Sequence, residues 1–481
     1  MTIPIGLPAQ RSVPPTLGDE VLLTGAALIT MDAELGDLAQ GDVLVRGSKI
    51  AAVGNDLSAA ASPDCTVIDA EGFILAPGFH DTHRHCWQGV FRRLIPNVDD
   101  NEAYVRVAHG SLAKAYTPKD IYLGNYLSAL GCLDAGITTV MDFSHNSRSG
   151  AHADAAVEGL RDSGIRAVHA NCAPVKGSWE DQWPADLERL QQRYFTDDES
   201  LVSLRMGLLG VEDIGGRNIA LSSDRIRLAR SMGIGISVDA VLGKPSSDLV
   251  LKVASADCLG PDVLLIHCTD LEEEAWRTIA STGAGVSLAP TSDAQIGIAA
   301  AIPPIQTALD HGVRPSLSVD VEIALATDMF SQMRMVLTTQ RMLSFNRRYH
   351  AAGGLVGDFD ASVMADLPTG ISVRDVLEFA TIAGARANGL ADVTGSLSPG
   401  KEADIIAIDA NTFANIPLNN VVGTVVQGAS AGDIAMVLVG GQVRKWHGQL
   451  VGVDLADVRQ QVLHSRDRLM AEAGVHLDLL S

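Results

Sequence analysis

Hydrophobic and polar residues follow three successive patterns along the chain. From residue 20 to 75, short apolar runs such as "EVLLTGAALITM" and "GDVLVRGSKIAAVG" alternate with turn residues, which predicts a small unit built of β-strands. From about residue 78 to 390, short apolar runs alternate with longer segments of helical periodicity, such as "HADAAVEGLRDS". That alternation is typical of repeated β-α units around a parallel sheet. After residue 395, strand-like runs return in "GSLSPGKEADIIAID", "VVGTVVQG" and "DIAMVLVGGQVRKWHGQ".

The central region contains the eight candidate strands that a (β/α)8 barrel needs. They cover residues 74–83, 136–145, 164–173, 201–212, 233–241, 262–270, 283–292 and 313–322. We therefore expect an α/β fold, a TIM-type barrel with a small composite β-sandwich domain built from both chain ends. The expected bounds are residues 1–77 for the N-terminal part of the β-domain, 78–392 for the barrel, 393–452 for the C-terminal part and 453–481 for a closing amphipathic helix.

Three histidines crowd into the stretch "APGFHDTHRH", at the end of the first predicted barrel strand. His83 and His85 are two positions apart, so on a strand both side chains point to the same face. The carboxyl ends of barrel strands carry the active site in this fold. Two imidazoles converging there indicate a site for a divalent metal ion of borderline softness. His80 is expected to serve structure instead, because it lies on the other face or one turn too early.

The composition of the chain indicates its cellular compartment and the classes of partner that it can bind. The chain has 36 Lys and Arg against 58 Asp and Glu, a net charge of −22, which would repel phosphate backbones and anionic lipid. No apolar run reaches the roughly 18 residues of a membrane span, and no secretory signal is visible. Six cysteines without a C-x-x-C pair indicate free thiols in a reducing compartment. We expect a cytoplasmic homo-oligomer that acts on a small molecule, without nucleic acid or membrane partners.

Five segments in a fixed order carry a family resemblance. They are "GFILAPGFHDTHRH", "AGITTVMD", "LIHCTDLEEEAW", "GVRPSLSVD" and "GSLSPGKEADIIAID". Together they resemble the amidohydrolase superfamily, in the branch of cytosine, guanine and S-adenosylhomocysteine deaminases and triazine hydrolases. The resemblance implies a metal-dependent hydrolase with His83, His85 and Asp320 around the metal. It also implies that Asp320 accepts a proton from the attacking water. His267, from the sixth strand, would donate a hydrogen bond to the substrate oxygen or the water, or contact the metal.

The fifth strand departs from the pattern of the deaminases that the chain resembles. Those deaminases place a histidine there as a third nitrogen ligand, with a glutamate three residues later that moves a proton onto the substrate ring. This chain reads "GISVDAVLGK", so Asp239 stands in place of the histidine and no glutamate follows. An aspartate can still bind a divalent metal through oxygen. The substitution therefore favours a metal hydrolase over a heteroaromatic deaminase.

Other residues indicate how many metal ions the site holds and which side chains line the substrate pocket. The fourth strand ends "GLLGVED" without a lysine that could bridge two metals, and Lys176 in the preceding loop is interpreted as solvated, so we expect one ion. Zinc, cobalt, iron and manganese all suit a set of histidines and carboxylates. Aromatic and imidazole rings near the strand ends could wall an apolar substrate and supply directional hydrogen bonds; these are Trp87, Phe91, His145 and His169.

Three functional hypotheses follow. The chain resembles hydrolases that degrade phenylurea and thiocarbamate herbicides in three features: "DFSHN", "LIHCTDLEEEAW" and a fifth strand without histidine. This resemblance implies xenobiotic degradation. The leading hypothesis is cleavage of a C–N or C–S bond at a urea, carbamate, thiocarbamate or amide carbonyl. The alternative is deamination or dechlorination of a nitrogen heterocycle such as a pyrimidine, purine or triazine. The third is a metal-free binding protein on a barrel that has lost its activity.

Overall fold

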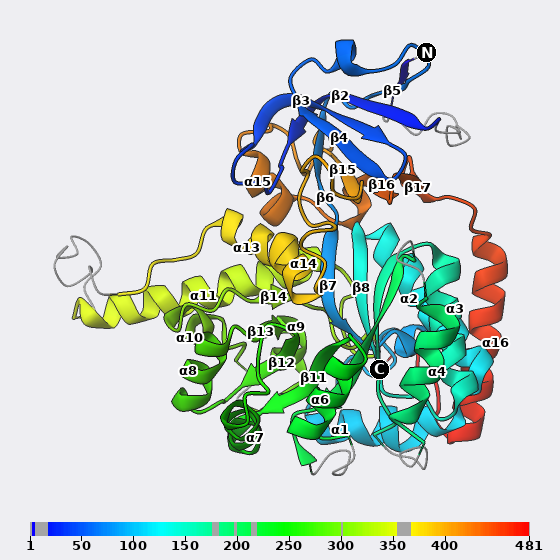
Figure 1. The fold of residues 1–481 in the computed structure, drawn as a ribbon, viewed down its shortest axis with the longest axis vertical. Coiled ribbons are helices and arrows are strands. Elements are labelled where there is room, and N and C mark those ends of the chain that lie inside the picture. The colour runs from blue at the N-terminus through cyan, green and yellow to red at the C-terminus, as the bar shows by residue number, and fades with distance from the viewer. Residues whose placement is uncertain are drawn as a thin grey trace.

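Eight parallel strands form the centre of the molecule. The structure, a computed structural model, describes residues 2–4, 18–175, 182–196, 200–212, 219–299, 302–353 and 367–480. Within these residues the strands pair in chain order as a nearly closed barrel (Figure 1). They are β7 (Phe79–Arg84), β8 (Ile137–Ser144), β9 (Arg166–Asn171), β10 (Val202–Leu209), β11 (Gly235–Leu242), β12 (Val263–Thr269), β13 (Gly285–Leu288) and β14 (Ser316–Leu317). Each strand lies within or overlaps one of the eight predicted runs, so the predicted α/β barrel is confirmed.

Backbone bonds just beyond β14 close the barrel against its first strand. The amide of Asp320 donates to the carbonyl of His83 at 2.9 Å, and the amide of His85 donates to the carbonyl of Asp320 at 3.1 Å. β14 itself has only two residues, so these bonds extend the last strand toward β7. The same bonds bring three of the predicted metal ligands side by side.

Helices surround the barrel, as the β-α alternation predicts. Sequence signals set their ends: Thr117 and Asp120 form a capping box before α2, and α3 ends at Gly164, whose φ of 72° is a conformation that favours glycine. The main helices around the barrel are α2 (Pro118–Asp134), α3 (Gly150–Ser163), α4 (Ala185–Tyr194), α6 (Ser223–Ser231), α7 (Gly243–Ser255), α8 (Glu273–Thr282), α10 (Ile305–Asp310), α11 (Met329–Ala351), α13 (Val373–Ala380) and α14 (Ile382–Ala387).

Both ends of the chain contribute strands to one second sheet. β6 pairs antiparallel with β15, with Ala76 opposite Ile406, so segments more than three hundred residues apart share a ladder. We propose that the β-domain and the barrel divide near residues 77 and 393. The ten strands are β1 (Thr2–Pro4), β2 (Glu20–Leu28), β3 (Leu38–Arg46), β4 (Lys49–Gly54), β5 (Thr66–Asp69), β6 (Phe73–Pro77), β15 (Ile405–Asp409), β16 (Ile434–Val439), β17 (Gln442–Trp446) and β18 (Gln449–Leu450).

Gly78 divides the run predicted as one strand into β6 and β7. A Cβ at this position would lie 2.0 Å from Oγ1 of Thr138, so only glycine lets the chain pass this close to β8. The chain thus leaves the β-domain and enters the barrel within one residue. The first barrel strand, with its histidines, is anchored directly to the second sheet.

One predicted strand is wrong. "VVGTVVQG" forms a short helix α15 (Val421–Gly423) followed by a wider helical turn η5 (Thr424–Gly428). The Asn420 side chain accepts a hydrogen bond from the Gly423 amide at 2.6 Å, which starts the helix. Val425 and Val426 are buried in the core, so apolar residues that suggested a strand pack from a helical turn instead.

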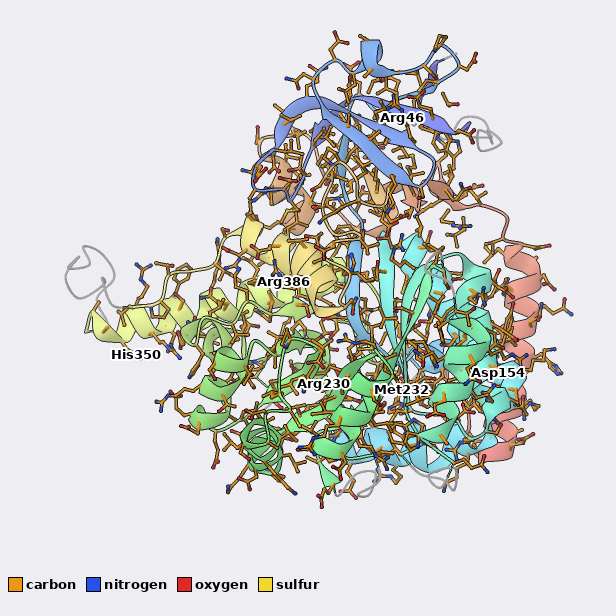
Figure 2. The ribbon with its side chains drawn as sticks, viewed as in Figure 1. Arg46, Asp154, Arg230, Met232, His350 and Arg386 are labelled. Atoms are coloured by element: carbon orange, nitrogen blue, oxygen red, sulfur yellow. The ribbon has the colours of Figure 1, made fainter. Side chains whose placement is uncertain are left out.

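Two long helices lie at the outside of the fold. The C-terminal tail forms α16 (Leu455–Ala473) beside α2. α11 runs outward from the barrel, with His350 near its outer end (Figure 2). Among the described residues, no helix has the length and apolar character needed to cross a membrane.

Candidate functional site

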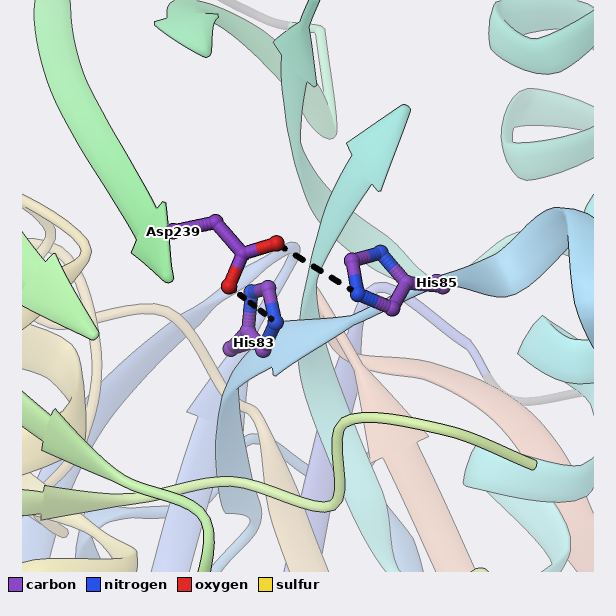
Figure 3. Close-up of side chains that lie close together, drawn as sticks. All are labelled: His83, His85 and Asp239. Atoms are coloured by element: carbon purple, nitrogen blue, oxygen red, sulfur yellow. Dashed lines mark ion pairs between the residues drawn. The ribbon is translucent and has the colours of Figure 1, made fainter. Parts of the chain in front are cut away.

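The two histidines of β7 and an aspartate of β11 face one another at the mouth of the barrel. Nε2 of His83 lies 3.4 Å from one carboxylate oxygen of Asp239, and Nε2 of His85 lies 3.6 Å from the other (Figure 3). All three side chains are buried. The i and i+2 spacing on the strand has therefore directed both imidazoles to one point, as the sequence predicts.

Asp320 and His267 reach the same point from two other strands. Oδ1 of Asp320 lies 3.2 Å from Nε2 of His83 and 3.1 Å from Nε2 of His85. Nε2 of His267 lies 3.2 Å from Asp239 and 3.9 Å from Asp320. The structure thus brings together all five residues that the sequence nominates as metal ligands.

Irregular backbone aims these side chains. The register of β11 against β12 shifts between Val238 and Val241, which places Asp239 within a bulge. A bulge bends its strand and redirects a side chain. His267 and Asp320 have φ of 72° and 71°, a left-handed conformation that costs residues with a Cβ about 1–3 kcal/mol. Two of the residues that would hold the ion therefore have a strained backbone.

Neighbouring groups fix the orientation of the candidate ligands. Nδ1 of His85 lies 3.0 Å from the carbonyl oxygen of Phe143, and Nδ1 of His267 lies 2.8 Å from Oδ1 of Asp293. Each Nδ1 can donate to its oxygen, which leaves Nε2 directed at the shared point. The hydroxyl of Ser292 donates to the second oxygen of Asp320.

The charges of the site fit a divalent cation. Burial opposes ionisation of Asp239 and Asp320, but the surrounding histidines outweigh it and lower the pKa of both carboxyl groups. Both nitrogens of His83 and Oδ1 of Asp320 are buried without a hydrogen-bond partner among the described residues. Nitrogen and carboxylate donors converge within 4.8 Å of one another. A cation would neutralise the carboxylates and satisfy these atoms, so the residues present fit a metal site.

Comparisons with known proteins agree with this arrangement. The model of the amidohydrolase family matches residues 243–444. The chain is 24% identical over 473 residues to a 5′-deoxyadenosine deaminase of Methanosarcina barkeri, covering 95% of this chain and 99% of that protein. It is 27% identical over 421 residues to a 5-methylthioadenosine/S-adenosylhomocysteine deaminase of Thermococcus onnurineus, covering 85% and 90%.

The chain is similar to members of the amidohydrolase family. Its fold is similar to that of a zinc-complexed atrazine chlorohydrolase from Arthrobacter aurescens TC1, with a TM-score of 0.76 and 21% identity over 93% of this chain and 100% of that one. It is also similar to an adenosine deaminase from Xanthomonas campestris with bound zinc, with a TM-score of 0.76 and 18% identity over 94% and 98%. The chain is a hydrolytic enzyme that acts on carbon–nitrogen bonds.

A pocket opens beside the candidate ligands. Its volume, including the open mouth, is about 510 Å³. Apolar side chains form much of its wall, and several polar groups face it. The lining includes Asn101, Tyr104, Val105, His109, His145, Val175, Leu209, Ala240, Leu242 and Ile298, next to His85, Asp239, His267 and Asp320.

The four predicted pocket residues divide into three groups. His145 lines the pocket. Trp87 lies behind it, with its indole nitrogen donating to Nδ1 of His145 at 3.2 Å. Like Trp87, Phe91 and His169 are not part of the lining, so of the four predicted residues only His145 lines this pocket. Phe91 packs against Tyr116 with ring centroids 6.0 Å apart, and His169 is held by Asp142 at 3.0 Å within the barrel wall.

Sequence reasoning missed four polar residues of the site. Asn101 and Tyr104 lie on α1 (Asn101–Val105), and His109 lies on the adjacent helical segment η3 (Arg106–Ser111). Asp293, on α9 (Pro290–Ile296), bonds His267. The position of Asp293 after the seventh strand was the one available signal, since functional residues gather at these strand ends. Lys176 lies outside the described residues.

Proposed function

We propose that this chain is a member of the amidohydrolase superfamily and an aminohydrolase, which replaces an amino group on a nitrogen heterocycle with oxygen from water. The observation that carries the hydrolytic part is the convergence of three imidazoles and two carboxylates at the mouth of the barrel. The heterocyclic substrate is supported by the two deaminases to which the chain is similar over most of its length. The largely apolar pocket wall suits a ring.

One divalent ion, which we propose to be zinc, would be held by His83, His85, Asp239 and Asp320. Such an ion lowers the pKa of a coordinated water from 15.7 to about 7, so that hydroxide is available at neutral pH. Zinc is the ion named with two proteins of similar fold. Nε2 of His267 lies close enough to contact the same ion or to hold the attacking water.

The protein's own groups can move the proton that the reaction releases. Asp320 is kept ionised by the neighbouring histidines, and Ser292 holds one of its oxygens, so this carboxylate can accept a proton from the water. The carboxylic acid formed can then give that proton to the leaving amine. Asp293 keeps the His267 ring in place while charge changes around it.

A second candidate function is hydrolysis at a urea, carbamate, thiocarbamate or amide carbonyl. One observation favours it: the pocket wall has Leu242, not a carboxylic acid, three residues after Asp239. Attack on a carbonyl carbon places charge on oxygen, which does not require an acid to protonate a ring nitrogen. Herbicides of the phenylurea and thiocarbamate classes are the substrates that would test it.

A substrate panel with product analysis separates the two reactions. The zinc-loaded enzyme is offered 5′-deoxyadenosine, 5-methylthioadenosine, cytosine, an aminotriazine, a phenylurea and a thiocarbamate, with and without a chelator. Ammonia from a ring compound, abolished by chelator and by His83→Ala, supports the aminohydrolase. Release of an aniline, alkylamine or thiol would support the carbonyl hydrolase. Purified protein without metal and without turnover would favour a binding protein.

Location and assembly are part of the proposal. All six cysteines are free thiols, and five of them are buried, which supports a reducing compartment such as the cytoplasm. We propose that the enzyme is a cytoplasmic homo-oligomer.

A further inference from the structure

Two imidazoles that are not candidate metal ligands form one side of the pocket. The ring of His145 stacks on that of His85, with centroids 3.9 Å apart and planes inclined by 11°. The ring of His109 meets His145 edge-on, with centroids 4.6 Å apart. Both residues are 3–4% exposed, so their remaining access is to the pocket. Their proton positions therefore decide what the pocket offers a substrate.

Trp87 determines where the His145 proton resides. An indole nitrogen can only donate, and Nε1 of Trp87 lies 3.2 Å from Nδ1 of His145. Nδ1 must accept this bond, so it carries no proton, and the neutral ring has its proton on Nε2. Tyr116 donates to the Trp87 carbonyl at 2.9 Å, which holds this segment in place. None of the described residues forms a hydrogen bond with Nε2 of His145, which leaves this N–H for the pocket.

A similar series of hydrogen bonds fixes the proton position of His109. Nε2 of Gln88 donates to the hydroxyl oxygen of Tyr104 at 2.7 Å, which leaves the tyrosine hydrogen free to point at Nε2 of His109, 3.4 Å away. Nε2 of His109 is then an acceptor, and this ring is neutral as well. Both imidazoles are thus fixed by donors behind them, and neither is available as an acid.

We propose that Nε2–H of His145 binds the acceptor atom joined to the carbon under attack, the adjacent ring nitrogen of the heterocycle. This inference rests on the proposed function. Water adding to a ring carbon pushes an electron pair onto that nitrogen, and a fixed N–H stabilises the developing charge without giving up its proton. His145 would therefore supply by hydrogen bonding what a glutamate at position 242 would supply by protonation. The pocket would select rings with an unsubstituted nitrogen beside the amino-bearing carbon.

Two substitutions separate this role from a structural one. His145→Leu removes the donor, whereas His145→Gln places an amide N–H near the position of Nε2. On the heterocycle that the enzyme turns over, we expect kcat to fall about 100-fold in His145→Leu, with a smaller change in KM, and to recover at least about tenfold in His145→Gln. Both variants should retain zinc. Equal losses in the two variants, or loss of metal in both, would show that His145 only supports His85.

The position of the proton on the His145 ring can be measured directly by nuclear magnetic resonance. In zinc-loaded protein with ¹⁵N-labelled histidine, the His145 signals, assigned by their absence in His145→Leu, should show an unprotonated Nδ1 and a protonated Nε2. Trp87→Phe should abolish this preference. A protonated Nδ1 in the wild type would overturn the inference while leaving the aminohydrolase proposal intact. Absence of turnover on every heterocycle would overturn both together.

Discussion

Nδ1 of His267, which lines the pocket, and Oδ1 of Asp293 lie 2.8 Å apart, and both side chains are buried. A carboxylate behind an imidazole fixes its tautomer and orientation, and loss of such a partner costs about 10- to 100-fold in metal affinity or activity. We predict a loss of this size in kcat or zinc affinity for Asp293→Asn, measured by steady-state kinetics and metal titration. Asp224→Asn, at a fully exposed site, is the matched control. Wild-type values in Asp293→Asn would show that His267 is held by its packing alone.

Asp239 is predicted to be a metal ligand, although the deaminases that the chain resembles have a histidine at this position. Removing a direct ligand should cost more than removing an outer partner, so Asp239→Ala should weaken zinc binding by at least about 100-fold. Competition with a chelator, followed by metal analysis, measures the change. Asp239→His replaces the oxygen donor by a nitrogen donor and should retain the ion. One tightly bound zinc in Asp239→Ala would remove Asp239 from the ligand set.

Leu242 lines the pocket three residues after Asp239, where an acid could reach a bound ring. If ring protonation limits the reaction, Leu242→Glu should raise kcat for heterocycle deamination, since general acid catalysis contributes about 10²–10⁴-fold. Leu242→Gln is the control, because glutamine has nearly the same shape as glutamate but carries no acidic group. The ratio of the two kcat values on one substrate is the measurement. Equal rates would indicate that hydrogen bonding already meets this requirement.

Glu322 is predicted to make stability depend on pH. Burial opposes its ionisation, but Arg92 and Arg84 outweigh burial and lower its pKa to about 2. An unfolded glutamate titrates near 4.5. The folded state therefore gains stability from ionised Glu322 above about pH 4.5, and this gain decreases as the pH falls toward 2.

Glu322→Gln tests that dependence. Breaking a buried pair costs about 3–5 kcal/mol, so the variant should be less stable than the wild type at pH 7 by an amount of this order. Urea denaturation at pH values from 7 to 3 should show the difference narrowing below about pH 4.5. Glu274→Gln, on the exposed face of α8, should show no such trend. A difference independent of pH would assign the loss to packing instead of charge.

Local patterns determined the barrel and the first part of the site. Short apolar runs between helical segments predicted all eight strands, because alternation of β and α units depends on the order of residues along the chain. The spacing of His83 and His85 predicted their convergence for the same reason, since the period of a strand is two residues. The pattern failed at 421–428, where a capping asparagine starts a helix and strand-like valines pack into the core from it.

Contacts between distant segments were decided only by the tertiary structure. Asp293 bonds His267 across 26 residues, and Trp87 bonds His145 across 58, so neither partnership has a signature in local sequence. His169 lies near a strand end like the candidate ligands, yet Asp142 holds it inside the barrel wall. The sequence by itself determined which residue types reach the mouth of the barrel. Which of them meet, and which nitrogen carries the proton, depended on packing among segments that the chain brings together only when folded.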